Sequence, residues 1–344
     1  MKELIDTATG SGINTIMAAM TGRPSWATYA LLFIVFVGTI PIQIVVHEAG
    51  HVIFGWLTGY RLVSIRLGSL VYFKTDAGWR FGRQKIAGTG GQALMRPPDK
   101  SPLPYRLYLC GGLLSNGVFT IIGGIALSPW RVMAIWWVLA SVALILMNGI
   151  PAGFNDAQAL RIVHREPGNQ QLLAIQLTAN ALLMAGYRYA DLPKTLYRPV
   201  RTKQRTYFND FQLFLEAAYD QEMGNYAQAA EILQTAFEDD QEMVPIYAAE
   251  LKQQLLLMLL LSDPQNSLIP ELWADVSQQA GAHQRQRLII QAVYAWYINH
   301  DGDQAKEALA KAQKLPAEPI RADQEIFTRF NEQLTADINK ETTA

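Results

Sequence analysis

Two histidines with a glutamate between them form the segment best suited to chemistry, His47-Glu48-Ala49-Gly50-His51. On an α-helix, side chains four residues apart lie on one face, so both imidazoles can reach a single metal ion. A carboxylate beside such a pair can serve as general base toward water in a hydrolytic zinc centre. The spacing therefore predicts that His47 and His51 bind zinc and that Glu48 is the catalytic base.

The residues before this segment are almost uncharged. From Ala27 to Val46 the chain has no Asp, Glu, Lys, Arg or His, which predicts a membrane-spanning helix. Ionisable groups inside a bilayer are costly and usually serve a function. A lone pair of helix histidines would more often be structural. The apolar setting is therefore what favours a metal site here.

The composition divides the chain into two halves. Long apolar runs occupy roughly the first 160 residues, and the remainder is charged and rich in Gln and Ala. A net charge of −1 and the lack of an aromatic-basic module argue against nucleic-acid binding.

Cys110 is the single cysteine, which excludes an internal disulfide and a cysteine-based zinc site. We predict an N-terminal tail at 1–26, an intramembrane core at 27–160 and a cytoplasmic helical domain at 161–344.

The core is predicted to contain three spans, at about 27–57, 108–127 and 132–150. Between the first two lies a polar loop, 60–106, whose alternating apolar residues predict a small β-hairpin or sheet at the membrane surface. This loop has nine Lys or Arg against Asp76 and Asp99, so the positive-inside rule places it in the cytoplasm.

Asp156 is the candidate third metal ligand. It follows the third span, and with three spans the end of the first and the end of the third lie on the same side of the bilayer. Two neutral imidazoles and one carboxylate leave a fourth tetrahedral position for water. An alternative role for Asp156 is to cap the helix that follows it. In the middle span, the amide of Asn116 needs a polar partner, on a neighbouring helix or on a bound peptide.

These residues resemble the site-2 protease family of intramembrane zinc metalloproteases. That family carries H-E-x-x-H in one span and N-x-x-P-x-x-x-L-D-G in a later one. Asn148, Pro151 and Asp156 stand at the matching positions, while Asn155 and Ala157 replace the Leu and the Gly.

The middle span is similar to the family's G-P-x-x-N element. Gly112 and Asn116 match it, and Leu113 stands where Pro is usual. The resemblance covers roughly 27–160. It implies that Asp156 is the third zinc ligand, that Glu48 is the catalytic base, and that Asn116 and Asn148 hold the substrate or the tetrahedral intermediate.

The C-terminal half is predicted to be soluble and all-α. The segment from Gly224 to Ala230 resembles the second half of a tetratricopeptide helix hairpin. A weaker match to the same pattern begins at Gly302. The apolar run from Leu255 to Leu261 is too short to cross a membrane and predicts a buried helix. Such a helical domain is suited to binding a partner protein.

We predict a mainly α, multi-pass protein of a bacterial cell membrane with its C-terminal domain in the cytoplasm. The leading function is a zinc-dependent intramembrane endopeptidase. It would cleave transmembrane or signal-peptide-derived segments near the cytoplasmic face, in regulated intramembrane proteolysis or peptide maturation. The alternative is a catalytically inactive membrane scaffold whose helical domain binds a partner protein.

Two other metal-site classes fit less well. A di-metal membrane oxidoreductase needs clusters of histidines beyond the five in this chain. A metalloprotease that takes Glu as its third ligand would need one in a helix after the third span. Glu166 is the only nearby candidate, and it is poorly placed before Pro167.

Overall fold

The structure is a computed structural model that describes residues 26–75, 78–83, 90–239, 243–278 and 284–343. All of the predicted tail except Trp26 lies outside these residues, as do Asp76 and Ala77 of the predicted turn. By their contacts, the residues form two compact units. One comprises Met1–Leu62, Gly90–Ala93 and Lys100–Arg161, and the other Val63–Thr89, Leu94–Asp99 and Ile162–Ala344.

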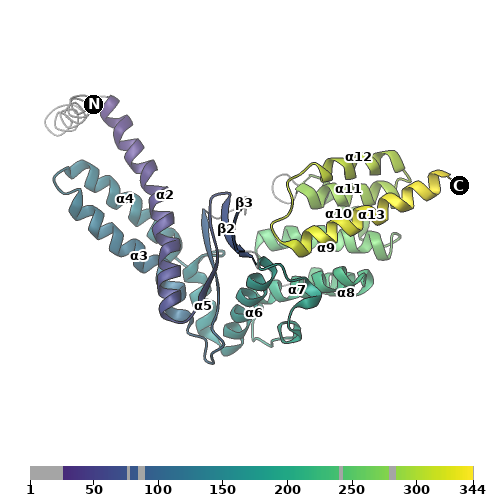
Figure 1. Cartoon of the computed structure of the whole chain (residues 1–344), viewed down its shortest axis with the longest axis horizontal. Coiled ribbons are helices and arrows are strands. Elements are labelled where there is room, and N and C mark those ends of the chain that lie inside the picture. The colour runs from purple at the N-terminus through teal and green to yellow at the C-terminus, as the bar shows by residue number, and fades with distance from the viewer. Residues whose placement is uncertain (1–25, 76–77, 84–89, 240–242, 279–283, 344) are drawn as a thin grey trace. The chain divides into compact units, whose positions relative to one another are not determined.

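The predicted mainly α class is confirmed, with twelve α-helices and one four-stranded sheet among the described residues. Three long helices dominate the first unit (Figure 1): α2 (Trp26–Leu57), α3 (Tyr105–Ala126) and α4 (Arg131–Gly149). Each contains a stretch long and apolar enough to cross a membrane, namely Leu32–Leu57, Tyr105–Ala126 and Arg131–Gly149. The three predicted spans are therefore present as helices, with ends shifted by a few residues.

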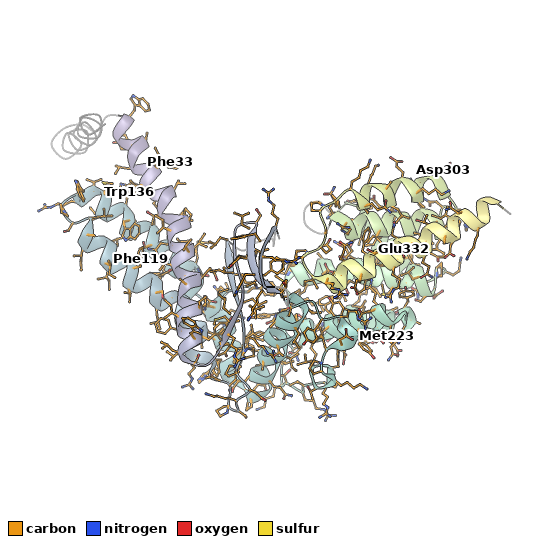
Figure 2. The ribbon with its side chains drawn as sticks, in the orientation of Figure 1. Phe33, Phe119, Trp136, Met223, Asp303 and Glu332 are labelled. Atoms are coloured by element: carbon orange, nitrogen blue, oxygen red, sulfur yellow. The ribbon has the colours of Figure 1, made fainter. Side chains whose placement is uncertain are left out.

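The three helices pack against one another, and glycines allow the closest approach. A Cβ atom on Gly50 of α2 would lie 2.3 Å from the Gly111 carbonyl oxygen of α3, so only a residue without a side chain fits. Pro41 lies inside α2, which continues on both sides of it. Away from these contacts the helices expose large apolar side chains such as Phe33, which Figure 2 shows projecting from α2. Such surfaces suit a lipid environment.

The polar loop after α2 folds as the predicted sheet. Its strands are β1 (Arg61–Leu67), β2 (Leu70–Thr75), β3 (Gly78–Arg83) and β4 (Gly91–Arg96), in the order β3-β2-β1-β4. The β1–β2 and β2–β3 pairs are antiparallel. Gly68, with φ of +59°, supplies the left-handed residue that the tight β1–β2 turn requires. β4 lies at an edge of the sheet.

The helical part of the second unit is a stack of helices that follows α5 (Asp156–Arg165) (Figure 1). The helices are α6 (Pro167–Met184), α7 (Tyr207–Met223), α8 (Tyr226–Phe237), α9 (Pro245–Ser262), α10 (Ile269–Gln278), α11 (Gln284–Tyr297), α12 (Gly302–Gln313) and α13 (Arg321–Thr343). Two 3₁₀ turns, Tyr189–Asp191 and Lys194–Tyr197, connect α6 to α7. The core contains the predicted buried helix α9, in which Leu255, Leu256 and Leu260 are fully buried.

The two tetratricopeptide-like segments are each the second helix of a packed helix pair. Gly224 adopts a left-handed conformation that ends α7, and α8 then packs on α7. Gly302 begins α12, which packs on α11. The structure thus shows helix pairs at both places, without confirming the tetratricopeptide character.

Candidate metal centre

Helix α2 positions both histidines of the H-E-x-x-H segment on one buried face. The His47 and His51 residues are only 8% and 7% exposed. Their Nε2 atoms lie 3.2 Å apart, and their rings are almost perpendicular at 79°. The i, i+4 spacing thus brings two potential metal-binding nitrogens to one point.

Asp156, at the first turn of α5, completes this cluster. Its Oδ2 lies 2.8 Å from His47 Nε2 and 3.2 Å from His51 Nε2. Burial alone would raise the pKa of Asp156, but the hydrogen bonds to His47 and His51 and their charges hold that pKa well below its usual value. The carboxylate is therefore ionised and ready to act as a ligand at neutral pH.

Asn155, the residue before Asp156, organises the turn between α4 and α5. Its Nδ2 donates to the carbonyl oxygens of Met147 and Ile150, at 2.8 and 2.6 Å. Its Oδ1 accepts from Gln158 N at 2.9 Å, which is the bond of a helix N-cap. The capping role considered for Asp156 is therefore performed by Asn155, which leaves the Asp156 carboxylate to face the histidines.

Glu48 is buried beneath the start of β4. It is 6% exposed, and Ala93 of β4 donates a backbone hydrogen bond to its carboxylate. A Cβ atom on Gly91 would lie 2.7 Å from Glu48 Oε1, so the absence of a side chain there lets the strand approach. The predicted base is thus held by the loop that follows the first span.

Helix α3 contacts the other nitrogen of each imidazole. The Tyr108 carbonyl oxygen lies 2.7 Å from His51 Nδ1, and Asn116 Nδ2 lies 3.3 Å from His47 Nδ1. Gly112 lies between them on the same face, where a Cβ atom would be only 2.4 Å from His47 Cε1. One face of α3 therefore sets the position of both rings.

A second polar contact joins the spans one turn before His47. Gln43 is fully buried, and its Nε2 donates to Ser141 Oγ of α4 at 2.6 Å. Thr39, a further turn away, is also buried and bonds to its own helix backbone at Val35. The polar face of α2 thus extends from His51 back to Thr39.

The two asparagines assigned to the substrate differ in placement. Asn116 is 1% exposed and contacts His47 as described. Asn148 is half-buried near the end of α4, and its Nδ2 donates to Leu144 O of its own helix. Within the described residues, Asn148 makes no hydrogen bond to the histidines or to Asp156.

The cluster of His47, His51 and Asp156 can hold a metal ion. Zinc bonds of about 2.0–2.2 Å in a tetrahedron place the ligand atoms about 3.3 Å apart. The three separations here, 2.8, 3.2 and 3.2 Å, come close to that value. Two imidazoles and a carboxylate are a donor set that zinc and other first-row divalent metals accept. The residues therefore fit a metal, and their chemistry does not single out one element.

Comparison of the chain with protein-family models, with curated proteins and with solved structures found no match. The arrangement of the residues and the resemblance described above are thus what support an assignment of function.

Three contributors to the site were not predicted from the sequence. They are the Tyr108 carbonyl, the Asn155 cap and the Gln43–Ser141 pair. Asn155 had a detectable signal, because Asn is a preferred N-cap residue. Gln43 is the only amide side chain in the apolar run before His47, and it could have been noted for that reason. A backbone carbonyl leaves no trace in the sequence.

Proposed function

We propose that this protein is a zinc-dependent intramembrane endopeptidase, with His47, His51 and Asp156 as the metal ligands. The observation that carries the proposal is the convergence of these three side chains among three helices suited to a membrane. The resemblance to the site-2 protease family supports the same assignment. Bound zinc would supply a Lewis acid that activates water and polarises the scissile carbonyl.

Glu48 is the proposed general base. It sits next to His47 in α2, and the Ala93 N–H holds its carboxylate in place. In a peptidase the same group takes a proton from the attacking water and returns it to the leaving amine. Its burial beside two imidazoles supports a catalytic rather than a solvated role.

β4 is the proposed docking edge for the substrate. A peptide bond within a helix is hydrogen-bonded and shielded, so a transmembrane substrate must unwind locally before it is cleaved. An extended segment can add to the edge of a sheet through backbone hydrogen bonds. β4 is an edge strand, and its first residues lie against Glu48. A segment bound there would pass close to the base.

The proposed orientation places the sheet and the C-terminal helices in the cytoplasm. The excess of Lys and Arg in the loop at 60–106 supports this orientation. An integral protein should remain in membranes washed at alkaline pH. Proteolysis of inverted and of right-side-out vesicles would then report which side exposes the helical unit.

The decisive experiment measures metal and cleavage together. Detergent-purified protein is analysed for zinc, and cleavage of a model transmembrane substrate is compared with that by Glu48→Gln. We expect about one zinc per chain. We also expect Glu48→Gln to keep its metal while cleavage falls by about 10²–10⁴-fold. Protein that takes up no metal under metal-replete conditions would favour the inactive scaffold instead.

A further inference from the structure

The metal site requires a defined proton position on each histidine. A neutral imidazole has one N–H and one lone pair, and only the lone pair can bind a metal. The Nε2 atoms of His47 and His51 are the ones that meet Asp156. Each Nδ1 must therefore carry the proton, and each needs an acceptor when buried.

His51 has an acceptor of fixed polarity. Its Nδ1 lies 2.7 Å from the Tyr108 carbonyl oxygen, and a carbonyl can only accept. In a neutral imidazole this contact favours the proton on Nδ1, which leaves the lone pair on Nε2. The backbone of α3 thus selects the metal-binding form of one ligand.

His47 faces a group whose polarity can be reversed. Its Nδ1 lies 3.3 Å from Asn116 Nδ2, so the metal-binding form would place one donor against another. Among the described residues, Asn116 Oδ1 is buried without a hydrogen-bond partner. Turning the amide by 180° exchanges these two atoms and places Asn116 Oδ1 where it can accept from the Nδ1–H of His47.

The surroundings make this contact costly to lose. Asn116 is 1% exposed and His47 is 8% exposed, so water has little access to either group. An unsatisfied donor is expensive in such a setting. Gly112 also leaves no space for the His47 ring to swing away toward α3 without a clash. The ring and the amide are therefore confined to one another.

We propose that Asn116 is a positioning residue whose side-chain oxygen accepts from His47 Nδ1–H, so that Nε2 presents its lone pair to the metal. This inference rests on the proposed metal site, and it replaces the substrate-binding role that the family resemblance implies for Asn116. The 1% exposure of the amide leaves it no surface on which to meet a peptide. It also gives the G-x-x-x-N spacing of α3 a physical meaning, since Gly112 admits the ring and Asn116 orients it.

The test compares two replacements of opposite hydrogen-bonding character. Asn116→Leu keeps the approximate volume but removes the acceptor, whereas Asn116→Asp keeps an oxygen acceptor and cannot donate. Zinc affinity of the full-length protein in detergent is measured by competition with a chelator. The visible spectrum of the Co²⁺-loaded protein reports the ligand environment independently of activity. Size-exclusion profile and helix content show that each variant is folded.

We expect Asn116→Leu to weaken zinc binding by about 10–100-fold, the usual cost of losing such an outer partner. Asn116→Asp should retain the affinity and the cobalt spectrum. Thr120→Val is the matched control, because among the described residues the buried Thr120 hydroxyl donates to its own helix, at Asn116 O, and to no other group. The zinc affinity of Thr120→Val should equal that of the wild-type protein.

Three outcomes would overturn the inference. Unchanged affinity in a folded Asn116→Leu variant would show that the acceptor is dispensable. Equal weakening in Asn116→Leu and Asn116→Asp would show that the amide acts by donating or by shape alone. If the unchanged protein binds neither Zn²⁺ nor Co²⁺, the proposed function fails together with the inference, whereas the first two results leave the metal site intact.

Discussion

His51 Nε2 lies 3.2 Å from Asp156 Oδ2, although 105 positions separate the two residues in the chain. The first residue belongs to α2, and the second begins α5 after two further long helices. A contact between groups so far apart requires the whole three-helix arrangement. We expect loss of this one carboxylate to lower the metal affinity of the site more than the stability of the fold.

Replacing Asp156 by Ala should weaken zinc binding by more than about 100-fold, since it removes a direct ligand rather than an outer partner. Chelator competition on the purified protein measures this loss. Asp303→Asn is the control, because that carboxylate lies exposed at the first turn of α12 (Figure 2). Equal affinities in Asp156→Ala and Asp303→Asn would remove Asp156 from the ligand set.

Gly112→Ala should disturb the His47 ring, because the added Cβ would lie 2.4 Å from its Cε1 atom. We expect zinc affinity to fall by about tenfold or more, in line with the loss of ligand orientation. Gly117→Ala, in the same helix, is the control because nothing lies within 4 Å of its Cβ. That change should leave zinc binding intact and stabilise the helix by up to about 1 kcal/mol. Similar zinc affinities for the two variants would contradict the close contact.

Asn155→Ala should loosen the turn that presents Asp156. The change removes the bonds to the carbonyl oxygens of Met147 in α4 and of Ile150 just after it, and it removes the N-cap of α5. We expect a loss of stability of about 1–2 kcal/mol from the cap and a fall in zinc affinity. Asn155→Asp keeps the capping oxygen but cannot donate to Met147 and Ile150. Its stability should therefore lie between those of Asn155→Ala and the wild-type protein, and closer to the wild type. A thermal unfolding series with all three proteins tests this order, and a different order would assign Asn155 no role in the turn.

Asp323 should make the helical unit less stable as pH rises from about 4 to about 6. Burial raises its pKa to about 6 despite the hydrogen bond from Tyr189. In this pH window the folded carboxyl keeps a proton that the unfolded one, with a pKa near 3.9, has lost. The free energy of unfolding therefore falls with rising pH, and the contribution is fully present only below about pH 4.

Asp323→Asn should remove this slope, because the amide oxygen still accepts from Tyr189 and carries no charge. At pH 7 the variant should be more stable than the unchanged protein by roughly 1–2 kcal/mol. Urea unfolding of the full chain at pH 4, 5, 6 and 7 measures both quantities, with Asp303→Asn as the exposed control. Parallel pH profiles for the unchanged and Asp323→Asn proteins would show that Asp323 titrates normally.

Local patterns were sufficient for the helices and for the ligand pair in α2. Long uncharged runs predicted three spans, and alternation predicted the sheet, because both depend on the residues within one element. The i, i+4 spacing predicted that His47 and His51 share a face for the same reason. The tetratricopeptide pattern identified a helix pair at each place and nothing more specific, since many helix pairs share that spacing.

The sequence by itself determined which residues can bind a metal and which segments can cross a membrane. The tertiary structure decided what each of those residues faces. Asn155 rather than Asp156 caps α5, the start of β4 covers Glu48, and α3 faces the outer nitrogen of both histidines. These are contacts between separate elements, and they depend on how closely backbones approach. A glycine at position 50 or 112 permits that approach, but only the packed helices reveal its partner.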